Sequence, residues 1–417
     1  MARTPTQRSS PKPAPSPPDT VLPIAVDRRP RVPLLVLLGA ATSLVGGLIW
    51  DIAWDASVGK DSFWSPPHLL MNIGSFLTWL TAVWLTVEAT RTDHPATIRL
   101  WKGRMPLGAA FILWGGLSML AWGVLDLWWT SAYGLFSGFW IPPQLLFSLS
   151  VMVLLSGTFL VAVSWSNNTL LPTAHKAAKQ STKIRRQEAV SAFPSAFQLS
   201  SLPVLWAPGL LLVFGVVMTL QYNLPNLQHT ALFYTISCPL NAFILIWTAQ
   251  ASGFRWAAVV IALVFTGLSC IPLWVFPLIS ATPLIGPVYQ PISHLMPPPF
   301  PLLLLAPALG MDLISQRLQR NDWLLSLVLG ALFVILFVLA QWPFAAFLLS
   351  PASDNWFFAG GAKYWPFYVQ IGPERAQFWG QEQSPFTSGT VAICLLTTVA
   401  AARVGLWLGR WTERLRR

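Results

Sequence analysis

The sequence predicts an all-α fold, a polytopic integral membrane bundle of about ten transmembrane helices. The first observation is composition, since 54% of the 417 residues are hydrophobic and 10% are charged, whereas a soluble domain carries about 25% charged residues. The second is that apolar residues gather in runs long enough to cross a bilayer. The third is that Lys and Arg collect in alternate connections. This pattern excludes an ordinary cytosolic enzyme, a disulfide-stapled secreted module and a disordered protein.

Residues 1–32 are rich in Pro, Ser and Arg and have no apolar periodicity. They predict a flexible cytoplasmic arm. The apolar run that follows has no small-residue cleavage site and continues directly into Trp50-Asp51-Ile52-Ala53-Trp54. We therefore interpret it as a retained first span and not as a signal peptide.

Apolar runs of about 20 residues recur along the rest of the chain. The runs at 203–221 and 297–315 differ from the others in being short or rich in proline. The expected spans are 33–54, 67–90, 106–128, 143–165, 203–221, 230–250, 255–276, 297–315, 323–349 and 386–408. The three cysteines, Cys238, Cys270 and Cys394, fall inside these runs without motif spacing, so we expect them to be small packing residues.

Charge placement supports an even number of spans with both termini in the cytoplasm. In that arrangement the outer connections carry only Lys60, Lys363 and Arg375, and all the basic clusters lie inside. This split follows the positive-inside rule and predicts a multi-pass protein of the inner or plasma membrane. We expect the basic cytoplasmic loop 166–202 to contact lipid headgroups, and we expect no nucleic-acid partner.

Two expected outer connections share one pattern, which predicts a duplicated helix hairpin. Asp-x-x-Trp closes one helix and Phe-Trp-x-Pro-Pro-x-Leu-Leu opens the next, within 51–70 and again within 126–146. The two copies differ in spacing by one residue. A repeat of this kind indicates internal duplication. The chain then divides into a duplicated four-helix membrane unit at 33–165 and a six-helix membrane unit at 203–417.

The first hairpin gathers the best candidate ligands. Asp51 and Asp55 are four residues apart and share one helix face. Pro66 and Pro67 can begin the next helix, because its first N–H groups have no partner there, and His68 then lies in the first turn. Asp61, in the connecting loop, could join them. Two interpretations stay open: a metal site with oxygen and nitrogen donors, or a hydrogen-bonded Asp–His pair that pins the hairpin.

The segment Asp51–Gly74, DIAWDASVGKDSFWSPPHLLMNIG, resembles the metal-binding segment of the copper membrane monooxygenases, which lies in their C-type membrane subunit. These enzymes are the particulate methane and ammonia monooxygenases. The family pattern is an Asp, a His four residues later and a second His thirteen residues after that, with a Trp before the first His. This chain has Asp51, Trp54, Asp55 and His68 at those offsets. The resemblance covers this segment and its internal copy.

The ligand pattern is degenerate. Asp55 stands where the family has its first His, and in the second hairpin Asp126 is followed by Thr130 and Gln144 at the two His positions. Carboxylates favour harder ions than copper, whereas imidazole suits copper and zinc. The resemblance implies copper or another divalent metal, such as zinc or manganese, at the first site. The second site is expected to be metal-free. The ligands implied for the first site are Asp51, Asp55, His68 and Asp61.

Two further outer segments carry candidate functional residues. His294 precedes a proline-led segment and is either an additional ligand or a hydrogen-bonded boundary residue. The loop 350–385 is strongly aromatic. Because Trp and Tyr favour the membrane boundary and also anchor interfaces, this loop is either a cap on the headgroups or a docking surface for another membrane subunit or a periplasmic domain.

Three functions follow as hypotheses. The leading one is a structural or accessory integral membrane subunit of a larger complex, related to the C-type subunit of the copper membrane monooxygenases. The second is an active metal-dependent membrane monooxygenase or oxidase that uses Asp51, Asp55 and His68. The third is a membrane transporter, because ten spans and proline-broken segments allow a path. The sequence leaves enzymatic activity open. It contains no phosphate-binding Gly-rich loop, Ser/His/Asp constellation or haem-attachment motif.

Overall fold

A computed structural model describes residues 32–59, 64–92, 97–100, 103–134, 140–180, 202–284, 292–318, 321–361, 363–365 and 387–415. Within these ranges the chain is an α-helical bundle with almost no sheet, and eight helices are long and apolar enough to cross a membrane. The predicted all-α polytopic bundle is therefore confirmed.

The described chain consists mainly of helices. The helices are α1 (Val32–Ser57), α2 (Pro66–Arg91), α3 (Leu107–Tyr133), α4 (Pro142–Gln180), α5 (Leu202–Met218), α6 (Leu220–Asn223), α7 (Ala231–Ser252), α8 (Ala257–Val275), α9 (Leu305–Arg317), α10 (Asp322–Leu348) and α12 (Ser388–Leu415). Single 3₁₀ turns lie at η3 (Pro225–Leu227), η4 (Phe276–Leu278) and η5 (Pro351–Ser353). The sequence did not predict the antiparallel strands β1 (Ile98–Leu100) and β2 (Gly103–Met105) between α2 and α3.

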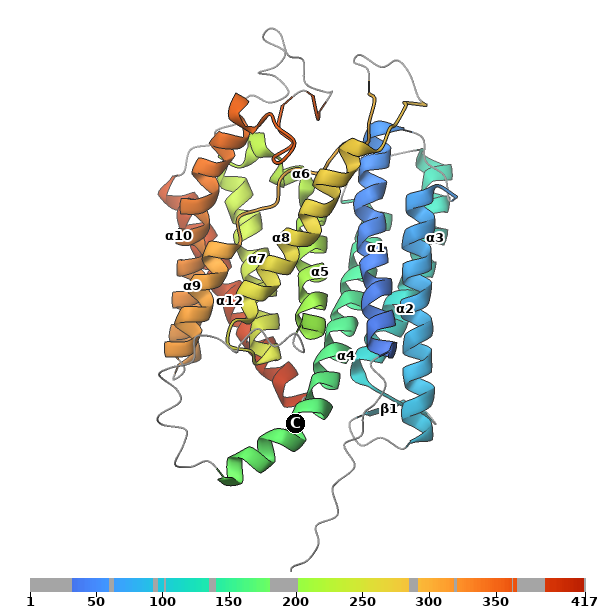
Figure 1. Ribbon diagram of the computed structural model, residues 1–417, viewed down its shortest axis with the longest axis vertical. Helices are drawn as coiled ribbons and strands as arrows, with labels where there is room; N and C mark the ends of the chain where they lie inside the picture. Colours follow the sequence, from blue (N-terminus) through green and yellow to red (C-terminus); the bar gives the residue numbers. More distant parts are fainter. Residues whose placement is uncertain are drawn as a thin grey trace, which may run out of the picture.

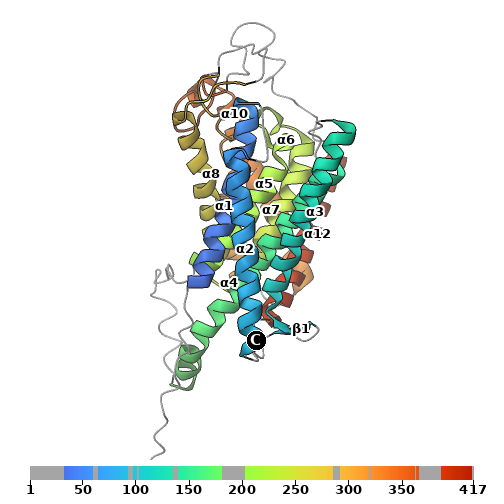
Figure 2. The same cartoon turned by 90° about the vertical axis from the view of Figure 1, so that its right-hand side faces the viewer.

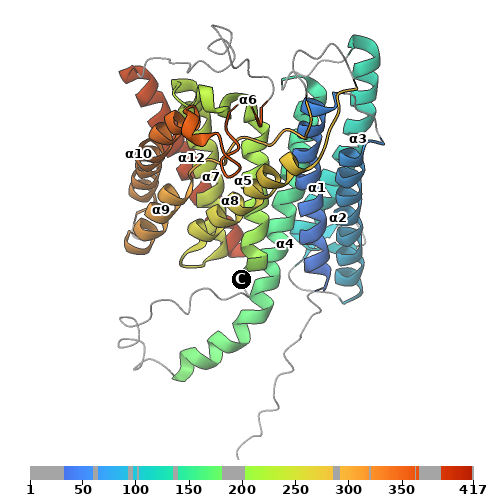
Figure 3. The ribbon, with the colours of Figure 1, turned by 45° about the horizontal axis from the view of Figure 1, so that its top comes forward.

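The helices run roughly parallel to the long axis of the molecule (Figure 1). α1 begins and α12 ends at the same, lower end of the bundle, which we call the base. The turns from α1 to α2 and from α3 to α4 lie at the opposite end, which we call the hairpin end. Seen from the side of the first helices, α1 and α2 lie in front of the later helices (Figure 2). In the view with the top turned forward, α1 to α3 lie on one side and α7, α9, α10 and α12 on the other (Figure 3).

Helix α5 joins the two sides of the bundle. It packs against α1 and α4 of the first unit and against α7 and α8 of the second. Eleven of its seventeen residues are buried, from Val204 to Gly215. A helix that is apolar all round is expected in such a central position. This explains why the expected span 203–221 is short but continuous in apolar character.

The two N-terminal hairpins pair in the same register. A Cβ on Gly74 of α2 would lie 2.6 Å from the carbonyl oxygen of Ala40 in α1. At the corresponding place in the second hairpin, a Cβ on Gly115 of α3 would lie 2.8 Å from the carbonyl oxygen of Ser150 in α4. Small residues at these crossings let the backbones approach closely.

A second pair of contacts repeats the same register. A Cβ on Gly47 would lie 2.7 Å from the Met71 side chain. In the second hairpin, the residues at the corresponding positions are Trp122 and Phe147, whose ring centroids are 4.7 Å apart. The hairpins therefore share both their helix pairing and their sequence pattern.

The expected span 297–315 is helical only in its second half, so the first half of that prediction is wrong. Residues 295–304 form neither helix nor strand, and α9 begins at Leu305. The cause is the run Pro297–Pro299 followed by Pro301, because proline lacks an N–H and disfavours helix in the residue before it. The missing donors also make a non-helical stretch less costly in lipid. The Leu303 N–H, which remains, donates to Gln341 Oε1 at 2.8 Å.

Candidate functional site

The hairpin end brings together Asp51 and His68, the two central candidate ligands. The Nε2 of His68 lies 3.2 Å from Oδ1 of Asp51, and the two side chains are 24% and 16% exposed. The prolines at the start of α2 place His68 in its first turn, as expected. Asp51 lies in the penultimate turn of α1, which extends to Ser57. The α1–α2 turn therefore joins a carboxylate to an imidazole at the end of the bundle.

The Asp51 carboxylate is poorly compensated apart from this contact. Its Oδ1 is shielded from solvent and accepts no hydrogen bond of good geometry in the described part of the chain. Removing a carboxylate oxygen from water without a partner is unfavourable. The neighbouring imidazole therefore supplies the nearest electrostatic compensation, and the pair fixes α2 against α1.

The second hairpin contributes to the environment of the same imidazole. The charges of His68 and Asp126 interact, which places Asp126 of α3 within electrostatic range of α2. The other two residues of the second candidate site are engaged through their backbones. The Thr130 carbonyl accepts the Gly134 N–H at 3.0 Å, and the Gln144 carbonyl accepts the Ser148 hydroxyl at 2.7 Å.

The first site has two other candidate ligands, Asp55 and Asp61. Asp55 is exposed one turn further along α1, and Asp61 lies outside the described residues. Among the residues that the structure describes, no three His, Cys, Asp or Glu side chains form a group that could hold a metal ion. A copper, zinc or manganese centre needs about three or more protein donors. The described donor set therefore does not fit such a centre.

His294 is held by neighbours of its own. Its Nε2 lies 3.3 Å from the Tyr364 carbonyl oxygen, and its Nδ1 lies 3.4 Å from the Ser293 hydroxyl. The adjoining segment is tied to α1, because the Met296 N–H donates to the Ser57 hydroxyl at 2.8 Å. These contacts are those expected of the hydrogen-bonded boundary residue.

The first part of the aromatic loop 350–385 folds onto the hairpin end, and residues 366–385 lie outside the described residues. The Phe358 ring is 4.8 Å from Phe347 and 5.1 Å from Phe300, measured between centroids. The Trp274 indole donates to the Phe357 carbonyl at 2.9 Å. This part of the loop is a cap over the second unit, and Trp356 stays largely exposed on it.

Sequence reasoning missed a buried polar network in the second unit. Gln341 of α10 accepts from the Leu303 N–H and donates to Gln228 Oε1 at 2.7 Å. Gln228 donates to the Asn223 carbonyl at 2.7 Å, and the Ser237 hydroxyl donates to Asn223 Oδ1 at 2.8 Å. Both glutamines are fully buried. A Gln inside the apolar run 323–349 was the signal that could have revealed this network.

His229 lies beside the network, in the connection before α7. Burial lowers the pKa of His229, and a hydrogen bond with the backbone of Trp342 opposes that shift. Its ring meets the Trp342 ring edge-on, with centroids 4.7 Å apart. A lowered pKa means that the neutral imidazole is the favoured form in this environment.

The base of the second unit holds a buried acid. Asp312 of α9 is 5% exposed and accepts hydrogen bonds from the N–H groups of Ala258 and Val259 at 3.3 and 2.9 Å. It therefore caps the start of α8. Asp312 also lines a cavity of about 400 Å³ together with Gln250 and Arg255. We call this cavity the base vestibule.

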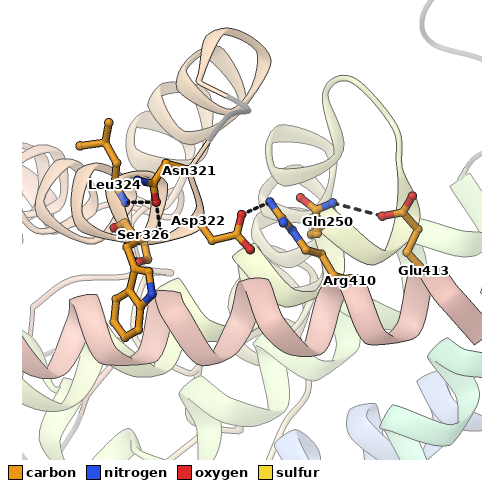
Figure 4. Close-up of polar contacts among 8 residues, drawn as sticks. Gln250, Asn321, Asp322, Leu324, Ser326, Arg410 and Glu413 are labelled. Atoms are coloured by element: carbon orange, nitrogen blue, oxygen red, sulfur yellow. Dashed lines mark hydrogen bonds and ion pairs between the residues drawn. The ribbon is translucent and has the colours of Figure 1, made fainter.

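Polar contacts beside the base vestibule tie α12 to α7 and α10 (Figure 4). Asp322, at the start of α10, pairs with Arg410 of α12. Gln250 of α7 donates to Glu413 at 3.4 Å. Asn321 caps α10 by accepting the N–H groups of Trp323 and Leu324. These contacts fix three helices at the base.

The fold is that of a polytopic helical membrane protein. An acid–imidazole contact joins its first two helices. No protein-family model, curated protein or solved structure matches the chain.

Proposed function

We propose that the chain is an accessory integral membrane subunit of a larger complex, related to the C-type subunit of the copper membrane monooxygenases. In this proposal the Asp51–His68 pair is a structural clasp derived from a metal-binding hairpin. The observation that carries it is that Asp51 and His68 keep their contact, while Asp55 occupies the position of the missing imidazole and is exposed. A scaffold that keeps its geometry while its donor set is incomplete is expected to retain a structural role.

The proposed orientation places the base in the cytoplasm. The described Lys and Arg residues near helix ends gather at the base, and Lys363 is the one at the hairpin end within the described ranges. Those at the base include Arg91, Arg99, Arg104, Arg255, Arg317 and Arg414. The positive-inside rule then puts the clasp and the aromatic cap on the outer face. The cap is where we propose that another subunit or a periplasmic domain docks.

Purification from native membranes tests this proposal. A chain tagged at its C-terminus, extracted in mild detergent and weighed by native mass spectrometry, is expected to appear in a complex of fixed stoichiometry with other membrane subunits. A lone chain with oxidase or monooxygenase activity, lost in His68→Ala, would instead favour the metal-dependent enzyme.

A membrane transporter is the second candidate, and one observation favours it. The segment 295–317 is irregular in its first part and helical in its second, and it runs from the Gln341 network to the base vestibule beside Asp312. Discontinuous crossings and buried polar groups often mark solute or ion paths in transporters. In a transporter, the Gln341 network and the base vestibule beside Asp312 would both belong to the path of the solute or ion.

Proteoliposomes separate the two candidates. The accessory proposal expects that vesicles containing only this chain take up solutes and ions no faster than empty vesicles. Uptake that exceeds the empty-vesicle rate, and that falls in both Gln341→Leu and Asp312→Asn, would establish the transporter instead. Leu339→Ala, a change at a lipid-facing position of α10, is the matched control.

A further inference from the structure

An apolar crevice lies between the two membrane units. Its volume is about 310 Å³, within the roughly 300–1,000 Å³ range of small-molecule sites. α1 supplies one wall with Gly46 and Trp50, and α8 supplies the other with Ile271 and Val275. Val213 of α5 lies at its inner side. The crevice is therefore built where the units diverge around the central helix.

The crevice opens at the depth of the hydrocarbon core. Gly46 lies about 21 Å along α1 from its start and about 16 Å from its end, at 1.5 Å per residue. That position falls within the roughly 30 Å apolar thickness of a bilayer. Gly46 is exposed, and Ile271 and Val275 on the opposite wall are 56% and 43% exposed. The mouth of the crevice therefore faces lipid.

The lining has little that could recognise a polar ligand. Thr42 is its one hydroxyl, and that hydroxyl already donates to the Leu38 carbonyl and accepts from the Trp206 indole. The Trp50 indole nitrogen is shielded from the cavity surface. The remaining wall groups are aliphatic or aromatic carbon. An occupant bound here is held by packing contacts and shape.

The interior continues beyond the visible crevice. A smaller cavity of about 50 Å³ shares Ile49, Val213 and Pro272 with it and reaches the proline-rich segment at Phe300. Those three side chains stand between the two spaces. A second, mostly apolar space thus lies behind the inner wall of the crevice.

We propose that this crevice binds one acyl chain of a membrane phospholipid, which fills the space between α1 and α8 and couples the two units. Because the mouth of the crevice opens onto hydrocarbon, the occupant comes from the bilayer. Because the lining is almost entirely carbon, the occupant is apolar. A helix from another subunit has a diameter of about 10 Å and would cover the mouth without entering the crevice. The inference does not depend on the accessory role proposed above.

Glycine positions allow a clean test. A Cβ on Gly46 would meet no atom within 4 Å, so Gly46→Leu places its side chain in the crevice without striking the backbone. Ile271→Trp fills the crevice from the opposite wall. Gly123 of α3 is also exposed and also has no atom within 4 Å of a Cβ, but it does not line the crevice. Gly123→Leu is therefore the matched control.

The purified full chain is reconstituted in vesicles of palmitoyl-oleoyl phosphatidylcholine that contain a phosphatidylcholine with a diazirine in one acyl chain. After illumination, mass spectrometry compares labelling of 268–275 in α8 with labelling of 117–127 in α3, an ordinary lipid-facing surface. We expect α8 labelling to exceed α3 labelling, and to fall about threefold or more in Gly46→Leu and Ile271→Trp but not in Gly123→Leu. Equal labelling of the two segments in the wild type, or α8 labelling that both crevice variants leave unchanged, would overturn the proposal.

Discussion

The imidazole of His68 lies 3.2 Å from the carboxylate of Asp51, so the first turn of α2 is joined to the last turns of α1. The same imidazole interacts electrostatically with Asp126 of α3. The imidazole is therefore within electrostatic range of one acid from each hairpin of the first unit. Replacing His68 is therefore the most direct way to distinguish a structural role of the Asp51–His68 pair from a role in metal chemistry.

Replacing His68 should destabilise the first unit. His68→Ala leaves the shielded oxygen of Asp51 without its compensating partner, and we expect a loss of about 1–3 kcal/mol. Thermal unfolding in detergent, followed by tryptophan fluorescence, measures the change. Gln144→Ala, at the equivalent position of the second hairpin, is the control and should shift stability by about 0.5 kcal/mol or less. Equal losses in the two variants would contradict the clasp.

The close crossing at Gly74 should tolerate no added atom. A Cβ there would lie 2.6 Å from the Ala40 carbonyl oxygen, so Gly74→Ala forces α1 and α2 apart. We expect a loss of about 1–3 kcal/mol from this overpacking. Gly39→Ala is the comparison, since a Cβ there meets nothing within 4 Å. That variant should be neutral or stabilising by up to about 1 kcal/mol, because Ala favours helix. If Gly74→Ala unfolds at the wild-type temperature, the two helices do not cross as described.

The Gln341 side chain should hold residues 295–304 in place against α10. Gln341→Leu removes the acceptor of the Leu303 N–H and the donor to Gln228, and each stranded group costs about 1–3 kcal/mol. Limited proteolysis and thermal unfolding report the loss, with Leu339→Ala on the lipid-facing side as the control. Wild-type stability in Gln341→Leu would show that the network does not support the segment.

Acid should destabilise the second unit through His229. Burial lowers the pKa of His229 in the folded state below the value of about 6.5 in an unfolded chain. The stabilising contribution of the neutral ring is therefore complete above about pH 6.5 and is lost as the pH falls toward the folded-state pKa. Unfolding temperatures measured between about pH 7.5 and 5 should fall more steeply for the wild type than for His229→Gln. Parallel curves would contradict this role.

The membrane architecture was accessible from the sequence because lipid imposes a simple constraint. A chain that crosses hydrocarbon must use long apolar helices, and α10 (Asp322–Leu348) differs from the expected 323–349 by a single residue at each end. The proline run at 297–301 was visible as well. The structure that this run adopts depends on tertiary contacts, because Gln341 of α10 accepts the Leu303 N–H that no helix satisfies.

The site was predictable only in part. Proline at the start of α2 and the spacing of the acids were enough to place His68 beside Asp51. The approach of Asp126 to His68 depends on how α3 packs against α2, which no local pattern encodes. The capping role of Asp312 was not predictable either, because its partners, two backbone N–H groups of α8, are distant in sequence.

Elemental analysis of the purified chain tests the clasp most directly. The wild type and His68→Ala are purified in parallel without chelator and analysed for copper, zinc and manganese by inductively coupled plasma mass spectrometry, alongside their unfolding temperatures. We expect no stoichiometric metal that depends on His68, together with a lower unfolding temperature in the variant. A stoichiometric metal in the wild type that disappears in His68→Ala would contradict the structural role and restore a metal centre at the hairpin end.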